Sequence, residues 1–226
     1  MKTLDVYSIF KSINGEVSPQ QQGSLCTFIR LAGCNLRCSW CDTPYAQDPN
    51  NTVRIMTPKK TISKIETKNV VITGGEPLMQ EEGLIELFKE LTLGDYFISV
   101  ETNGSFPIKR HLYGWANWVV DWKCPSSGMN NKMDMDNFYE LGRKDVIKFV
   151  INDEKDFKHA IVVITTMMEA FYNRHTHPVF AFSPTPKMKS DILIDMMKKN
   201  KMLCNLGAVF SLQIHKLIFP KGEKEI

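Results

Sequence analysis

Three cysteines close together in the sequence carry the clearest chemical signal of this chain. Cys34, Cys38 and Cys41 have the spacing C-x3-C-x2-C and directly follow an apolar run. Three thiolates in one short loop suit a thiophilic metal centre. A structural zinc site has four protein ligands, and this loop contains no fourth, although a distant cysteine or histidine could supply one. In a [4Fe–4S] cluster the three cysteines would leave one iron open, so the spacing favours a cluster with a reactive iron over zinc.

A second motif stands at the end of the next apolar run, where Thr73 is followed by Gly74-Gly75-Glu76-Pro77. Two glycines without Cβ atoms at a strand end let a ligand approach the backbone N–H and C=O groups. A Gly-Gly pair alone is typical of an ordinary turn, but one strand after the cysteine motif it is a much more specific combination. Glu101-Thr102-Asn103-Gly104 follows the next run; it is a turn with an Asn-Gly pair that could also line the site.

Together these motifs resemble those of the radical S-adenosylmethionine (SAM) superfamily. The resemblance implies that Cys34, Cys38 and Cys41 hold a [4Fe–4S] cluster whose open iron binds SAM. Reductive cleavage of SAM then gives a radical that takes a hydrogen atom from the substrate. The cofactor supplies this chemistry, and the protein orients the reactants and excludes water. The implied SAM contacts are Trp40, Gly75, Glu76, Asp121, Trp122, Lys123, Ser183, Pro184, Thr185 and Pro186.

The surrounding residues match a narrower family. Ile13-Asn14-Gly15-Glu16 precedes the first expected strand, Arg30 lies on that strand, and Gln213-Ile214-His215-Lys216 lies near the end of the chain. This combination, with Cys41-Asp42-Thr43, resembles the 7-carboxy-7-deazaguanine synthase family from residue 9 to residue 220. The resemblance implies conversion of 6-carboxy-5,6,7,8-tetrahydropterin to 7-carboxy-7-deazaguanine with loss of ammonia, in queuosine and 7-deazapurine biosynthesis, with SAM regenerated.

The same resemblance implies a set of substrate contacts. Arg30 offers a planar fork that matches a carboxylate, and Glu16 is an acceptor suited to the N–H-rich pterin. Thr43 would bind Mg²⁺ together with the substrate carboxylate, since Mg²⁺ needs few protein ligands; taken alone, Asp42-Thr43-Pro44 is an ordinary turn. The family more often carries glutamine where this chain has Asn14. The other expected substrate contacts are Ile13, Asn14, Gly15, Thr73, Gln213 and His215.

Two other functions remain open from the residues. A glycyl-radical-enzyme activase shares the small size and the cysteine spacing but acts on a protein partner, and Ser12-Ile13-Asn14-Gly15-Glu16 argues against it. A non-catalytic electron-transfer or zinc-binding protein would have no need of Gly74-Gly75-Glu76-Pro77. Binding of a pterin separates the synthase from the activase, and SAM cleavage under reductant excludes the non-catalytic protein.

The elements that must position these residues can be read from the apolar runs. Strands are expected at residues 26–31, 69–73, 96–101, 118–121, 146–151 and 179–182. Several of these runs are continuously apolar, which is typical of parallel strands buried on both faces. Helices are expected to begin at Thr57-Pro58 and to span residues 81–91, 156–172 and 189–199. The alternation predicts one α/β domain over residues 1–226, a partial TIM-type barrel of parallel strands with its site at the carboxyl ends of the strands.

Composition narrows the possible partners. The 226 residues carry a formal net charge of +3, which is too mild to indicate nucleic-acid binding. No membrane span or signal peptide is expected, and together with an oxygen-sensitive cluster this predicts a cytoplasmic protein. An unclosed barrel leaves a sheet edge or apolar face to cover, which favours a homodimer. The resemblance implies a flavodoxin or ferredoxin as electron donor. Cys26, Cys124 and Cys204 are expected to be packed thiols.

Overall fold

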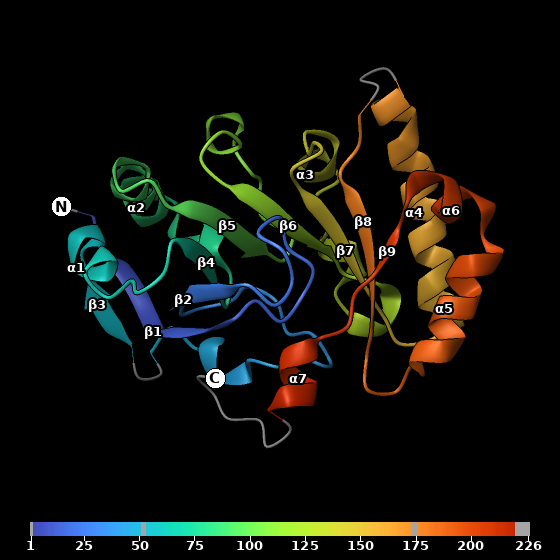
Figure 1. The fold of residues 1–226 in the computed structure, drawn as a ribbon, viewed down its shortest axis with the longest axis horizontal. Helices are drawn as coiled ribbons and strands as arrows, with labels where there is room; N and C mark the ends of the chain where they lie inside the picture. The colour runs from blue at the N-terminus through green and yellow to red at the C-terminus, as the bar shows by residue number, and fades with distance from the viewer. Residues whose placement is uncertain (1, 51–52, 173–175, 220–226) are drawn as a thin grey trace.

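A computed structural model describes residues 2–50, 53–172 and 176–219. Within these residues nine strands form one sheet in the order β3-β1-β2-β4-β5-β6-β7-β8-β9. Neighbouring strands are parallel from β2 to β9, whereas β1 is antiparallel to both β2 and β3. The sheet curves without closing, and the longer helices lie along its outer side (Figure 1). The expected partial barrel is therefore confirmed.

The six expected strands are all present, with ends that differ by at most two residues. The strands are β1 (Leu4–Ile13), β2 (Leu25–Leu31), β3 (Arg54–Met56), β4 (Asn69–Gly74), β5 (Phe97–Thr102), β6 (Asn117–Trp122), β7 (Val146–Ile151), β8 (Val179–Pro184) and β9 (Val209–Phe210). The helices are α1 (Pro58–Ile62), α2 (Glu81–Leu93), α3 (Asp136–Tyr139), α4 (Glu154–Tyr172), α5 (Ser190–Lys199), α6 (Lys201–Leu206) and α7 (Ile214–Ile218). As expected, Thr57 caps α1, because its side chain accepts a hydrogen bond from the Lys60 N–H.

The apolar pattern does not predict β1, and β2 is therefore not the first strand of the chain. The buried side of β1 carries Ser8 and Ser12 as well as Leu4 and Val6, so the apolar alternation that identifies a half-buried strand is interrupted. The strand β9 is also missed, because its two residues are too few to show any period.

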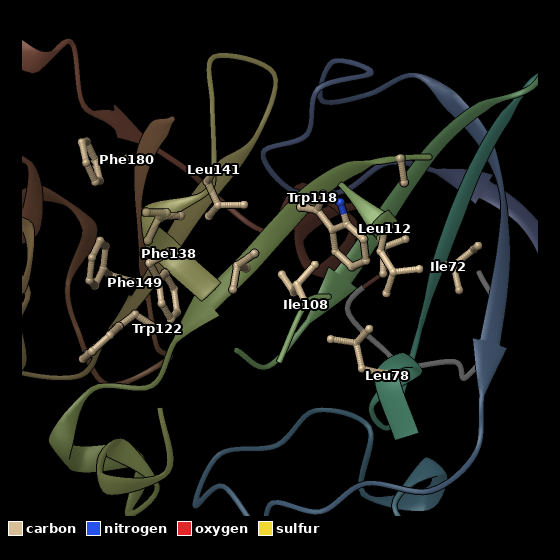
Figure 2. Packing of buried hydrophobic residues seen from close by; sticks show 14 of the residues in the cluster. Ile72, Leu78, Ile108, Leu112, Trp118, Trp122, Phe138, Leu141, Phe149 and Phe180 are labelled. Carbon is tan, nitrogen blue, oxygen red and sulfur yellow. The ribbon is translucent and has the colours of Figure 1, made fainter. Parts of the chain in front are cut away.

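Side chains that point alternately to the two faces of the sheet separate an apolar core from a polar interior. On β6, Trp118, Val120 and Trp122 belong to the main apolar core. Figure 2 shows Trp118 and Trp122 among other buried side chains of this core. Successive strand residues point to opposite faces, so Val119 and Asp121 face the interior of the barrel. The same period brings a row of polar side chains to the interior near the carboxyl ends of β2, β4, β5, β6 and β7: Arg30, Thr73, Glu101, Asp121 and Lys148.

The interior is filled at the opposite end. Val119, Val146 and Ala181 form a small apolar cluster there, against which Val17 of the β1–β2 loop packs. That loop crosses the unclosed side of the barrel. The Val17 N–H donates to Ser211 Oγ at 3.0 Å, next to the end of β9. The loop therefore runs from β1 towards the end of β9 and places residues 14–16 in the wall of the polar interior.

Candidate active site

A cavity of about 460 Å³ lies at the carboxyl ends of the parallel strands. Its wall combines the cysteine loop, the polar interior of the sheet, the β1–β2 loop and the segment that enters α7. The residues expected at the site that lie in this wall are Ile13, Asn14, Gly15, Glu16, Arg30, Cys34, Cys38, Trp40, Cys41, Thr43, Thr73, Gly75, Asp121, Lys123, Pro184, Thr185, Pro186, Gln213 and His215. Residues far apart in the sequence thus share one cavity.

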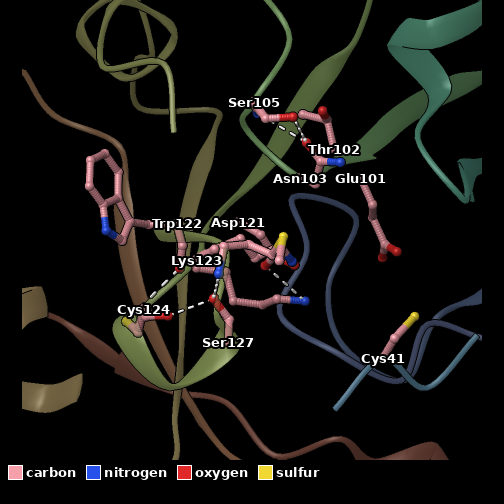
Figure 3. A network of polar contacts seen from close by, with 12 residues as sticks. Cys41, Glu101, Thr102, Asn103, Ser105, Asp121, Trp122, Lys123, Cys124 and Ser127 are labelled. Carbon is pink, nitrogen blue, oxygen red and sulfur yellow. Dashed lines mark hydrogen bonds and ion pairs between the residues drawn. The ribbon is translucent and has the colours of Figure 1, made fainter. Parts of the chain in front are cut away.

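Three residues expected to contact SAM do not lie in the wall. Trp122 points into the core, where its Nε1 donates to His159 Nε2 at 3.1 Å and its ring packs against Phe138. Figure 3 shows the indole on the opposite side of the strand end from the Lys123 amine. The physical reason is the strand period, which sends Asp121 and Trp122 to opposite faces. Ser183 is buried beside the cavity but outside its lining.

Glu76 is the third of these residues, and its carboxylate is occupied by the protein itself. It accepts hydrogen bonds from the Leu78 N–H at 2.9 Å, from Thr102 Oγ1 at 2.7 Å and from the Asn103 N–H at 2.7 Å. The side chain is fully buried, and this burial raises the pKa of Glu76. The glutamate therefore holds the start of the loop after β5 instead of facing the cavity.

The cysteine loop is closed on itself by backbone hydrogen bonds. The Gly33 N–H donates to Ala46 O at 2.8 Å, and the Cys34 N–H donates to Gln47 O at 3.1 Å. Near its middle the Ser39 N–H donates to Ser127 O at 3.1 Å, which fixes the loop against the segment after β6. The three cysteines therefore occupy a defined loop at one side of the cavity.

The glycine motif packs directly against this loop. The Gly75 N–H donates to Leu31 O at 2.9 Å, and the Glu76 N–H donates to Gly33 O at 2.7 Å. A Cβ atom on Gly75 would lie 1.9 Å from Gly33 O, so no other residue fits without a backbone shift. The glycines are thus needed for packing between two motifs, in addition to any ligand approach.

The three cysteine thiols are free and partly buried. Burial raises the pKa of Cys34 and of Cys38, so both remain thiols until a metal replaces the proton. Outside the cavity Cys26 and Cys124 are buried, as expected, whereas Cys204 is exposed. The expectation that Cys204 is a packed thiol is wrong, because its position on the short helix α6 faces solvent.

A buried lysine organises the charges opposite the cysteine loop. Lys148 Nζ lies 2.5 Å from Glu16 Oε2 and 3.2 Å from Asp121 Oδ1, and Lys123 Nζ lies 2.7 Å from Asp121 Oδ2. Burial alone would lower the pKa of Lys148, but Asp121 and Glu16 outweigh burial and hold it well above its ordinary value. Gln213 Nε2 donates to the second oxygen of Glu16 at 2.5 Å. The Glu16 carboxylate is therefore held from both sides.

Sequence reasoning did not assign Lys148 to the site. The expectation that the turn of residues 101–104 could line the site holds for Glu101, Thr102 and Asn103, which lie in the cavity wall. A lysine inside the apolar run of β7 is itself a signal, because a buried lysine needs a partner. Glu101 accepts a hydrogen bond from Thr73 Oγ1 at 2.8 Å. Burial and the nearby Glu16 carboxylate raise the pKa of Glu101 to about 6. One acidic group in the cavity wall thus changes charge close to neutral pH.

Two buried donors in the wall have no hydrogen-bond partner within the described part of the chain. They are Asn14 Nδ2 and Arg30 Nε. The Arg30 guanidinium also lies over the Phe10 ring, 5.4 Å from its centroid. Buried donors are normally satisfied, so these two indicate a ligand that carries acceptor oxygens or nitrogens.

Comparison with known proteins identifies the family. The model of the radical SAM superfamily matches residues 28–121. A 7-carboxy-7-deazaguanine synthase from Clostridium acetobutylicum is 38% identical, and the match covers 96% of each chain. This chain belongs to the 7-carboxy-7-deazaguanine synthase family. Two further relatives carry the same name. The synthase from Methanospirillum hungatei is 33% identical over 95% of this chain and 85% of the relative, and the synthase from Koribacter versatilis is 35% identical over 70% of this chain and 69% of the relative.

Membership of this radical SAM family implies a [4Fe–4S] cluster, SAM, a small-molecule substrate and a reductant. The residues fit the cluster, since three free thiols of one loop face one cavity and none of them forms a disulfide. The relatives support the synthase hypothesis and neither the activase nor the non-catalytic alternative. Among the described residues, no helix is long and apolar enough to cross a membrane.

Proposed function

We propose that this member of the synthase family converts 6-carboxy-5,6,7,8-tetrahydropterin to 7-carboxy-7-deazaguanine with loss of ammonia. The observation that carries the proposal is one cavity that combines three free thiols with buried, unpartnered donors. A volume of about 460 Å³ is in the range of small-molecule sites, which suits a pterin beside SAM. When bound, the cluster and SAM supply the radical chemistry, with Cys34, Cys38 and Cys41 as the cluster ligands.

The chain's own residues bind and orient the substrate in this proposal. Arg30 and Asn14 donate hydrogen bonds to substrate acceptor atoms, because their buried N–H groups otherwise lack partners. Glu16 and Glu101 accept hydrogen bonds from the N–H groups of the pterin. Lys148 and Gln213 keep the Glu16 carboxylate in place, so that it meets the substrate without a change of geometry.

A divalent cation, Mg²⁺, is part of the proposal. Thr43 lines the cavity, and Glu16, Asp42 and His215 each offer a ligand atom, with these atoms within 4.8 Å of one another. Burial lowers the pKa of His215, which favours the neutral imidazole that binds metals. Oxygen-rich donors of this kind suit a hard cation that also binds the substrate carboxylate.

The electron donor, the cellular location and the oligomeric state are also part of the proposal. A flavodoxin or ferredoxin would supply the electron, in the cytoplasm. A homodimer would cover apolar side chains that are exposed on the surface, such as Leu93 at 84%. Analytical ultracentrifugation at micromolar concentration tests the dimer, and a monomer there would contradict it.

The test of the function is an anaerobic reaction followed by mass spectrometry. Protein reconstituted with iron and sulfide is incubated with SAM, dithionite, Mg²⁺ and 6-carboxytetrahydropterin, and 7-carboxy-7-deazaguanine is expected. Cys38→Ala should lose the cluster absorbance and the product entirely. Cys204→Ala, which removes an exposed thiol, should retain both. SAM cleavage without this product, in protein with a full cluster, would contradict the proposed substrate and direct attention to other substrates.

A further inference from the structure

Asn103 lies at the boundary between the loop after β5 and the cysteine loop. Its side chain is 7% exposed, and its Nδ2 lies 3.8 Å from Cys34 Sγ and 2.9 Å from Asn35 Oδ1. Its backbone N–H is fixed by Glu76 Oε2 at 2.7 Å. The sequence predicts only that the turn of residues 101–104 could line the site, and the proposed function gives the Asn103 side chain no role.

The hydrogen-bond network determines which end of the amide faces the sulfur. The other end accepts from the Ser105 N–H at 3.0 Å and from Ser105 Oγ at 2.6 Å (Figure 3). A backbone N–H can only donate, so the atom that meets it is the amide oxygen. The NH₂ group must then face the cysteine loop. One of its hydrogens is directed to Asn35 Oδ1, and the other is left for the Cys34 sulfur.

Neighbouring bonds hold this arrangement in place. Asn35 Nδ2 donates to Ser105 Oγ at 2.8 Å, which closes a ring of three side chains around the amide. Thr102 Oγ1 donates to Glu76 at 2.7 Å, beside the bond from the Asn103 N–H. The buried glutamate of the glycine motif therefore positions Asn103, and Asn103 in turn reaches a cysteine of the cluster motif.

We propose that Asn103 donates an N–H···S hydrogen bond to the Cys34 thiolate of the cluster-loaded protein and thereby raises the reduction potential of the cluster. A donor at a ligating sulfur withdraws negative charge, and the reduced cluster, which carries one more negative charge, gains more from it than the oxidised cluster does. The inference rests on the proposed function only in taking Cys34 as a cluster ligand. Asn103 is a positioning and tuning residue, and it makes no contact with substrate in this proposal.

The experiment compares midpoint potentials of the reconstituted full-length chain, measured by anaerobic redox titration with EPR detection and without SAM. Asn103→Ala should lower the midpoint potential relative to the natural chain. A tenfold change in the one-electron equilibrium corresponds to about 59 mV, which sets the upper end of the expected shift. Asn103→Asp, which keeps the contacts to Ser105 but replaces the donor by an acceptor, should lower it further.

Asn137→Ala is the matched control. Asn137 is also buried and supports the same loop, donating to Gly104 O at 3.1 Å and to Phe106 O at 2.6 Å, and neither of these bonds reaches a cysteine sulfur. Its variant should leave the potential unchanged. An equal shift in Asn103→Ala and Asn137→Ala would show a general effect of loop distortion and would overturn the proposal.

The iron and sulfide content of each protein distinguishes a failure of this inference from a failure of the proposed function. An unchanged potential in Asn103→Ala with full iron and sulfide overturns this inference alone, whereas a natural chain that binds no cluster overturns the proposed function and this inference with it. If the Asn103 variants bind no cluster, pulsed EPR on the reduced natural chain labelled with ¹⁵N-asparagine replaces them. A ¹⁵N hyperfine coupling that Asn35→Ala retains supports the hydrogen bond, and its absence from the natural chain contradicts it.

Discussion

The two sides of the cavity are built by different interactions. The cysteine side is held mainly by backbone groups: Gly33 donates to Ala46 O, Glu76 donates to Gly33 O and Ser39 donates to Ser127 O. The opposite side is held by charges, with Lys148 between Glu16 and Asp121. Backbone bonds between adjacent loops fix geometry with little dependence on charge balance. Ion pairs taken out of water are stable only as complete sets, because each remaining charge needs its partner.

This difference suits the two tasks of the site. Ligands of a cluster must stay at fixed positions, and the cysteine loop is hydrogen-bonded to Ala46 and Gln47, to the glycine motif after β4 and to the segment after β6. A substrate instead has to be recognised by its donors and acceptors, which requires polar groups that are oriented in advance. The comparison predicts that steric changes damage the cysteine side, while charge changes damage the opposite side.

Removal of the positive charge of Lys148 should have the largest effect. Lys148→Met leaves Glu16 and Asp121 buried without their shared partner, and breaking a buried pair in this way costs about 3–5 kcal/mol in the free energy of unfolding. Urea denaturation followed by circular dichroism measures the loss. Lys158→Met is the matched control, because Lys158 pairs with Glu154 on an exposed helix face and should change stability little. Equal losses in the two variants would contradict the organising role of Lys148.

A steric change on the cysteine side should have the next largest effect. Gly75→Ala places a Cβ atom 1.9 Å from Gly33 O, so the cysteine loop must move, and overpacking of this kind costs about 1–3 kcal/mol. We expect weaker SAM binding by calorimetry on the reconstituted protein as well as lower stability. Gly114→Ala meets nothing within 4 Å and should change neither. Unchanged SAM affinity in Gly75→Ala would mean that the contact between the two motifs does not set the geometry of the site.

The sequence predicts the cysteine side better than the opposite side, for a physical reason. Cys34, Cys38 and Cys41 lie in one loop, so their spacing alone specifies a shared centre. The pair of Lys148 and Glu16 joins residues 132 positions apart, and it depends on how far the sheet curves and on the path of the β1–β2 loop. No local pattern contains that information.

Local sequence patterns place more side chains at the cavity than the structure does. Asp121, Trp122 and Lys123 were all expected to contact SAM, yet the two-residue period of a strand allows only alternate side chains to face the cavity. Glu76 was expected at the site because of its motif, but its carboxylate is used inside the protein. The family resemblance locates motifs, and only the packing decides which atoms of a motif face the ligand.

The smallest predicted effect is a pH dependence that belongs to the charged side. The pKa of Glu101 is raised from an ordinary value of 4.5 to about 6 by burial and by Glu16. The folded state therefore holds this proton more tightly than the unfolded state does. Its contribution to stability is fully present below pH 4.5 and is lost as the pH rises through about 6, by no more than about 2 kcal/mol.

Glu101→Gln should remove this pH-dependent step in stability while keeping an acceptor for the Thr73 hydroxyl. Free energies of unfolding from urea titrations between about pH 4.5 and 7 test it. Glu66→Gln, at an exposed pair with Lys11, should leave the step in place. The same ionisation turns Glu101 into a stronger acceptor, so pterin affinity should rise over the same interval in the natural chain and stay flat in Glu101→Gln. A stability step that persists in Glu101→Gln would assign the titration to another carboxylate and would weaken the division between a sterically fixed side and a charge-dependent one.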